Sequence, residues 1–166
     1  MQSSRRLGTP WMLALWAPPA LLVLIPLIAM QLSSEMAWSP GDFLAAALLG
    51  LALGGGFELA TRSSGSTAYR AAAALALLAG LGLVWVNLAV GIVGSEGNPA
   101  NLLFMLIPLL ALIGTAIARL RPRGMAWAMA VTGVAQLLLA GVAPFSAIFA
   151  LPWFASAWLF RKAARD

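Results

Sequence analysis

Long apolar runs separated by short polar segments dominate the pattern of this chain. Four of these runs cover residues 11–30, 43–61, 70–93 and 101–118. Each is close to the roughly 20 residues that a helix needs to cross about 30 Å of hydrocarbon. The pattern therefore predicts a membrane-spanning helix in each of these ranges.

A further apolar stretch, residues 125–160, is too long for one crossing. It is interrupted at Gly141–Pro144, and division there predicts two helices, over residues 125–142 and 144–160. Both are near the lower limit for a span. Pro152 predicts a kink in the second, because proline removes a backbone donor. The alternative is five helices with a re-entrant or interfacial segment in this region.

The basic residues favour six crossings over five. With six, all ten Lys and Arg residues fall on one side of the membrane. The loops on the other side then contain Glu35, Asp42 and Glu96 and no basic residue. This is the positive-inside pattern, which is most reliable in short loops. We therefore expect an all-α, polytopic bundle of six antiparallel helices, a single domain over residues 1–166. It would lie in the bacterial inner (cytoplasmic) membrane with both termini cytoplasmic.

The composition supports lipid as the solvent for most of the chain. Of the 166 residues, 62% are hydrophobic and 9% are charged, against about 45–50% and about 25% in soluble globular domains. A water-soluble fold of this size could not bury so much apolar surface. The net charge of +5 does not indicate nucleic-acid binding, because no basic run exceeds two residues and no aromatic side chains are interleaved with basic ones.

Cysteine and histidine are both absent from the chain. This excludes disulfides, thiolate catalysis, His-ligated haem and the common zinc and copper sites. The sequence also contains no phosphate-binding glycine loop and no nucleophile–base set. We therefore expect no enzymatic activity, no cofactor and no metal.

One ionisable residue, Glu58, lies within a predicted span, about one turn from its end. Arg62 follows four residues later, the spacing at which Glu and Arg share a helix face. The simpler interpretation is an interfacial ion pair that anchors the turn to the next helix. The alternative is a proton or cation site, because charge inside hydrocarbon is costly and often functional.

Small residues recur at four-residue steps on the same predicted helix, at Ala46, Gly50 and Gly54. Small residues at this spacing let two helix backbones approach closely in lipid. We interpret the three as a stripe that packs against another helix of the same chain. Homodimerisation through the stripe is the alternative.

The most polar segment between two spans is GIVGSEGNPAN, residues 91–101. Gly94 can end the preceding helix, because glycine adopts the left-handed conformation found there. Asn98 is a preferred N-cap, and Pro99 suits the first position of a helix. Local chemistry therefore predicts a turn, a cap and a helix start.

Several polar side chains in or near the spans are candidates for interaction. Asn87 lies near the end of its predicted helix, and an Asn in a span usually hydrogen-bonds a neighbouring helix. Thr115, Thr132 and Gln136 could join it in a polar network or line a narrow cavity. The candidate polar or interaction positions are Glu58, Arg62, Asn87, Glu96, Asn98 and Asn101.

Three stretches resemble a family of small uncharacterised bacterial polytopic membrane proteins. They are YRAAAALALLAGLGLVWVNLAVGIVGSEGNPANLLF, RPRGMAWAM and SAWLFRKAAR. The family has a similar core, N-L-A-V-G-I-x-G-S-E-x-N-P-A-N, after an aromatic-rich helix, and the resemblance covers roughly residues 37–165. It implies a helical fold in a membrane and no particular activity.

The pattern as a whole predicts a non-enzymatic accessory or assembly component that acts by helix packing. The alternative is a small dimeric ion or solute transporter or channel that uses Glu58, Asn87 and the loop bearing Glu96. In either case the expected partners are the lipid bilayer and a second copy or another membrane protein, with no nucleic acid.

Overall fold

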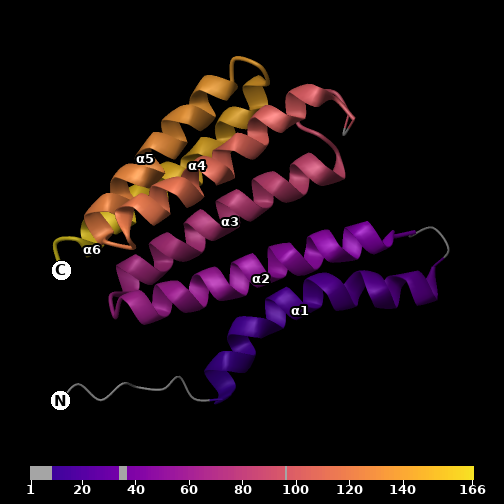
Figure 1. Ribbon diagram of the computed structural model, residues 1–166, viewed down its shortest axis with the longest axis horizontal. Helices are drawn as coiled ribbons and strands as arrows, with labels where there is room; N and C mark the ends of the chain where they lie inside the picture. Colours follow the sequence, from indigo (N-terminus) through magenta and orange to yellow (C-terminus); the bar gives the residue numbers. More distant parts are fainter. Residues whose placement is uncertain (1–8, 34–36, 96) are drawn as a thin grey trace. The chain divides into compact units, whose positions relative to one another are not determined.

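The computed structural model describes residues 9–33, 37–95 and 97–166, and every regular element within them is helical (Figure 1). The predicted all-α fold with six helices is confirmed. Glu35 and Glu96 lie outside the described residues. In chain order the elements are α1 (Thr9–Leu32), α2 (Pro40–Ser63), α3 (Thr67–Ala89), the 3-10 helix η1 (Pro99–Asn101), α4 (Leu102–Ala118), α5 (Pro122–Leu139), the 3-10 helix η2 (Pro144–Phe149) and α6 (Ala150–Ala163).

The contacts divide the chain into two compact units, Met1–Glu58 and Leu59–Asp166, where the sequence predicted a single domain. We call them the N-terminal unit and the four-helix unit. The first contains α1 and most of α2, and the second contains the end of α2 with α3 to α6.

Within the N-terminal unit, α1 contains Pro18, Pro19 and Pro26 and bends along its length (Figure 1). Each proline removes a backbone donor and crowds the preceding turn, which is the usual cause of a helix kink.

The start of α2 is fixed by a reciprocal cap. The Ser39 amide donates to Asp42 Oδ2 over 2.7 Å, and the Asp42 amide donates to Ser39 Oγ over 3.3 Å, so two amides at the helix start are satisfied.

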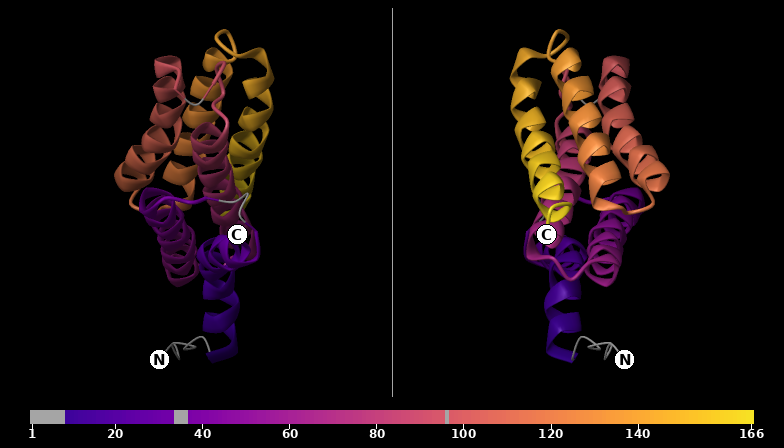
Figure 2. Two further views of the ribbon diagram at one scale, coloured as in Figure 1. Left: turned by 90° about the vertical axis from the view of Figure 1, so that its right-hand side faces the viewer. Right: turned by 90° about the vertical axis from the view of Figure 1, so that its left-hand side faces the viewer.

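The four-helix unit is a closed ring in which each helix contacts two others (Figure 2). α3 packs against α4 and α6, and α5 packs against the same two helices. The core between them contains large buried aromatic side chains and also close backbone contacts. Ser156 Oγ on α6 donates to the Ala72 carbonyl on α3 over 2.8 Å, which ties together segments far apart in the sequence. The largest buried apolar side chains are Trp153, Tyr69, Phe104, Phe160, Leu83 and Met129.

The two ends of the four-helix unit differ in charge. One end, here the basic end, is formed by the starts of α3 and α5 and the ends of α4 and α6. Tyr69 links three segments of the chain at this end. Its hydroxyl donates to the Leu120 carbonyl over 2.8 Å, and its ring packs edge-on against that of Phe160 with 5.0 Å between the ring centroids. The Lys and Arg residues at this end are Arg62, Arg70, Arg119, Arg121, Arg123, Arg161, Lys162 and Arg165.

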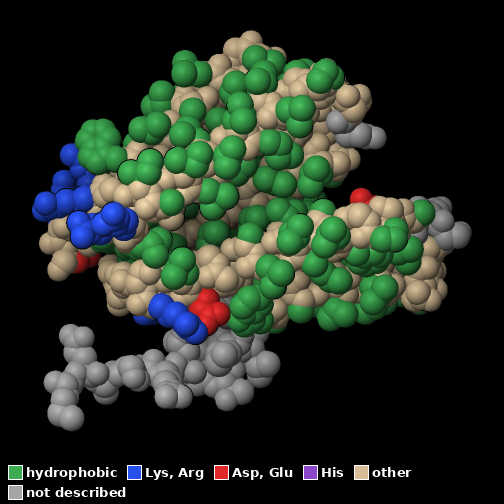
Figure 3. Space-filling model, viewed as in Figure 1, with side chains coloured by type: hydrophobic (Ala, Val, Ile, Leu, Met, Phe, Trp, Pro, Cys, Tyr) green, Lys and Arg blue, Asp and Glu red, His purple; other side chains and the backbone are tan. Residues whose placement is uncertain are grey.

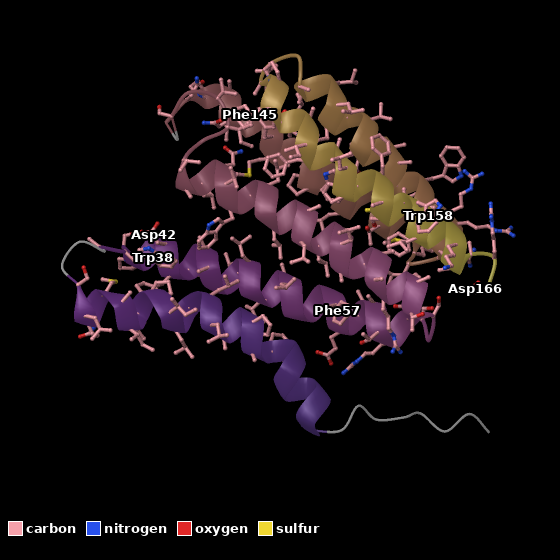
Figure 4. The ribbon with its side chains drawn as sticks, turned by 180° about the vertical axis from the view of Figure 1, so that it is seen from behind. Trp38, Asp42, Phe57, Phe145, Trp158 and Asp166 are labelled. Atoms are coloured by element: carbon pink, nitrogen blue, oxygen red, sulfur yellow. The ribbon has the colours of Figure 1, made fainter. Side chains whose placement is uncertain are left out.

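The opposite end, here the loop end, consists of the last turn of α3, residues 90–101 and residues 140–149. It contains no Lys or Arg at any position of the printed sequence. Figure 3 shows most of the blue side chains gathered where α6 finishes and a smaller blue group lower down beside red atoms, while green apolar side chains cover the flanks. Figure 4 places Trp158 and Asp166 near the basic end and Phe145 at the loop end.

Three helices are long and apolar enough to cross a membrane, and they cover Pro40–Ser63, Thr67–Ala89 and Pro99–Ala118. The flanks between the two ends are also strongly apolar. Ile117 is 77% exposed and Leu138 is 75% exposed, and soluble proteins do not leave such side chains exposed over whole faces. These features are those of a membrane protein.

The boundaries of the later helices differ from those predicted. α3 ends at Ala89 and not at residue 93, and α5 ends at Leu139 and not at residue 142. The last α-helix begins at Ala150, after η2, and not at residue 144. Pro152, where a kink was predicted, lies in the first turn of α6, where a helix has no internal partner for the backbone amide.

Candidate functional site

One asparagine organises the connection between α3 and α4. Asn101 is only 5% exposed, and its Oδ1 accepts hydrogen bonds from the amides of Ile92 and Val93, both at 2.8 Å. Its Nδ2 donates to the Ser95 carbonyl over 2.7 Å. The side chain therefore folds the segment after α3 against the start of α4.

Asn87 joins the same network from α3. Its Nδ2 donates to the backbone carbonyl of Asn101 over 2.8 Å, and its side chain is buried. This is the bond to a neighbouring helix that the sequence predicted, and it links the last turn of α3 to η1. Satisfying these amides inside the protein matters because an unpaired buried polar group costs about 1–3 kcal/mol.

Two glycines let the chain turn beneath this network. Gly91 has φ 73° and Gly94 has φ 70°, a left-handed conformation that costs glycine little. The sequence assigned the end of the helix to Gly94, but the chain leaves α3 at Gly91. The reason is tertiary, since Asn101 accepts the amides of Ile92 and Val93 and so draws both residues out of the helical path.

The start of η1 follows the local prediction. Asn98 is its N-cap and accepts the Ala100 amide at 2.9 Å, and Pro99 occupies the first helical position. The Asn98 amide itself donates to the Ser95 carbonyl over 3.0 Å. The polar side chains of this segment therefore stabilise the loop. The side-chain nitrogen of Asn87 and the side chain of Asn101 both hydrogen-bond to backbone groups.

Glu58 and Arg62 lie on one continuous helix but in different compact units. Glu58 is partly buried, Arg62 is exposed, and both side chains have interaction partners. Arg70 closes the turn to α3, because its guanidinium donates to the carbonyls of Ser64 and Thr61 over 3.1 and 3.4 Å. Arg62 is at the basic end and Asn87 is near the loop end, so the structure does not bring these two candidates together.

The small-residue stripe lies against α1 within the N-terminal unit. A Cβ placed on Gly50 would lie 3.2 Å from the Pro19 carbonyl oxygen, and one on Gly54 would lie 2.9 Å from the ring of Trp16. Ala46 is buried as well. Within one chain the stripe therefore packs against α1.

Gln136 does not join Asn87 but bonds to Ser146, which the sequence did not single out. Its Nε2 donates to the Ser146 carbonyl over 3.1 Å, while Thr132 bonds its own helix at Ala128. Three buried polar atoms have no partner among the described residues: Gln136 Oε1, Ser146 Oγ and Trp153 Nε1. Ser146 and Trp153 could not be found from pattern, because η2 and the true start of α6 were not predicted.

A second unpredicted feature is a hollow of about 510 Å³ between α5 and α6 at the basic end, here the α5–α6 hollow. Its volume is in the range of small-molecule sites. Three arginines and two tryptophans line it with four alanines. Those side chains are Arg123, Ala126, Trp127, Ala130, Ala157, Trp158, Arg161, Ala164 and Arg165.

Comparison with known protein families, curated proteins and solved structures found no match to this chain. The chemistry of the two ends is therefore the basis for any functional proposal.

Proposed function

We propose that this chain is a six-pass protein of the bacterial inner membrane that acts without enzymatic chemistry, as an accessory or assembly component through helix packing. Its basic end and both termini would be cytoplasmic. The observation that carries the orientation is the charge difference between the two ends of the four-helix unit. Eight Lys and Arg residues gather at one end and none at the other, as positive-inside proteins require.

The internal hydrogen bonds favour a packing role over a transport role. Asn87 and Glu58 were the two candidates inside spans for the transport alternative, and the amide nitrogen of Asn87 is already bound to the Asn101 carbonyl at 2.8 Å. Asn101 in turn uses its side chain on three backbone groups. A transport pathway through this end would have to break that network, and each buried group left unpaired costs about 1–3 kcal/mol.

Cysteine labelling in intact cells tests the orientation. The chain has no native cysteine, so Ser64→Cys at the α2–α3 turn and Ser95→Cys in the loop end can each be the sole thiol. An impermeant maleimide should label position 95 and spare position 64 until the cells are opened. Labelling of position 64 alone in intact cells would reverse the proposed orientation.

Purification in a mild detergent tests the packing role. A stable partner, either a second copy or another membrane protein, should remain bound at a fixed stoichiometry. A monomer that retains nothing would contradict the proposal. The transport alternative has its own test, since reconstituted protein with a Glu58→Gln control should then move protons or ions, and our proposal predicts no flux from either.

A further inference from the structure

The α5–α6 hollow is formed by one face of each helix. On α5, Arg123, Trp127 and Ala130 follow at steps of four and three residues, and on α6 Trp158 and Arg161 follow at a step of three. Residues at these steps lie on one side of a helix. Each helix therefore presents a cation near its terminus, then a tryptophan, then small residues toward the middle of the bundle.

The arginines of this hollow are not used to hold the protein together. Within the described residues, the guanidinium groups of Arg123, Arg161 and Arg165 have neither a hydrogen bond nor an ion pair, in contrast to Arg70, which closes a turn. All three side chains are exposed. The one acidic side chain described in the four-helix unit is Asp166, which is not among the residues that line the hollow. The hollow thus combines three positive charges with no internal counter-charge.

The remaining lining is suited to the interface of a bilayer. Trp127 is 73% exposed and Trp158 is 64% exposed, and tryptophan rings settle at the level of the lipid headgroups. Lys162 holds its ammonium 6.0 Å from the Trp158 ring centre, within the range of a cation–π contact. Ala126, Ala130 and Ala157 also line the hollow, and their methyl groups form an apolar surface, here the alanine floor, that a hydrocarbon chain can follow.

We propose that the α5–α6 hollow binds an anionic glycerophospholipid, with its phosphate between Arg123, Arg161 and Arg165 and an acyl chain along the alanine floor. Guanidinium groups match phosphate oxygens in geometry as well as charge, and basic pockets between helices on the cytoplasmic side are a known form of headgroup site. The assignment rests on the proposed membrane location of the basic end. A soluble anion would satisfy the arginines but would leave the apolar floor and the tryptophans without a role.

Native mass spectrometry of the full chain in a neutral detergent tests this site. The probe is dioleoyl phosphatidylglycerol, with dioleoyl phosphatidylcholine as the neutral lipid and glycerol 3-phosphate as the free headgroup. Phosphatidylglycerol should bind at least about tenfold more tightly than phosphatidylcholine, because phosphatidylcholine has the same phosphate but adds a choline cation, which the three arginines repel. Glycerol 3-phosphate at the same concentration should not displace it.

Two double variants remove the same charge from the basic end. Arg161→Gln with Arg165→Gln takes two guanidiniums from the hollow, and apparent affinity for phosphatidylglycerol should fall at least about tenfold. Arg119→Gln with Arg121→Gln takes two cations that do not line it, and affinity should change less than about threefold. Equal losses in both variants would overturn the proposal, because binding would then follow net charge and not this hollow.

A third variant tests the acyl path without altering charge. Ala130→Leu should fill the floor of the hollow and weaken phosphatidylglycerol more than it weakens glycerol 3-phosphate. Displacement of the lipid by glycerol 3-phosphate at equal concentration would assign the arginines to a soluble anion and overturn the lipid assignment. Because binding is measured in detergent, failure here is separate from failure of the labelling experiment, which tests the orientation alone.

Discussion

The two ends of the four-helix unit use polar side chains in opposite ways. At the loop end, the side chains of Asn87, Asn98 and Asn101 hydrogen-bond to backbone groups and so hold the connection between α3 and α4 in place. At the basic end, Arg123 and Arg161 face a hollow and bond to no described residue. The polar side chains of the loop end therefore have a structural role. The arginines beside the apolar surface of the hollow are free to bind the proposed lipid.

The largest expected effect comes from removing the side chain at the centre of the loop end. Asn101→Ala should destabilise the protein by about 3 kcal/mol, because two amides and one carbonyl lose their partner at once and unpaired buried groups cost about 1–3 kcal/mol each. Thermal unfolding in detergent measures this. The matched control is Asn98→Ala, which loses a single cap and should cost only about 1 kcal/mol. Equal effects would contradict a central role for Asn101.

Close packing inside the four-helix unit should have the next largest effect. A Cβ on Gly114 would lie 2.7 Å from Ala128 Cβ, which is too close. Gly114→Ala should therefore cost about 1–3 kcal/mol through overpacking of α4 against α5. On α3, a Cβ on Gly82 meets nothing within 4 Å, so Gly82→Ala should be neutral or stabilise by up to about 1 kcal/mol. If unfolding temperatures changed alike in the two variants, the α4–α5 contact would not be tight.

Backbone conformation at the loop end should matter slightly less. Gly91 has φ 73°, and a side chain there costs roughly 1–2 kcal/mol. Gly91→Ala should lower the unfolding temperature, and Gly97→Ala in the same loop serves as control, because a Cβ there meets nothing within 4 Å. A Gly91→Ala variant as stable as the parent would show that α3 does not need to end at this glycine.

The smallest expected effect on stability is at the basic end. Arg161→Gln with Arg165→Gln should change the free energy of unfolding by less than about 0.5 kcal/mol, because exposed side chains without partners contribute little. Unfolding without added lipid measures this. A loss of several kcal/mol would mean that these arginines hold the bundle together and are not free to bind a ligand.

Local chemistry could be predicted from the sequence, and contacts between distant segments could not. The cap at Asn98 and the helix start at Pro99 depend on neighbours one or two residues away, so the residue types alone are enough to predict them. Asn101 was a candidate interaction position, but its role in the connection could not be predicted, because its partners lie six to 14 residues away. The path of the chain between α3 and η1 is set by tertiary hydrogen bonds, which the pattern of apolar and polar residues cannot predict.

The same distinction applies to the helices and to the hollow. The apolar runs predicted six helices correctly, because a helix in lipid needs a long apolar segment. The start of α6 was misplaced, because the residues of the 3-10 helix η2 are as apolar as those of an α-helix. The α5–α6 hollow combines the start of one helix with the end of another, nearly 40 positions apart. The available signal was weak: an arginine four residues before Trp127 and another three residues after Trp158.

Melting of three proteins with and without phosphatidylglycerol tests the contrast between the two ends most directly. A ligand that binds only the folded state stabilises it by an amount that grows with the logarithm of the ratio of ligand concentration to Kd, so the parent chain should melt at a higher temperature with the lipid. Asn101→Ala should melt lower than the parent and still respond to the lipid. Arg161→Gln with Arg165→Gln should melt like the parent and lose the response. If Asn101→Ala abolished the response while the double arginine variant kept it, the proposed division between a structural end and a binding end would be wrong.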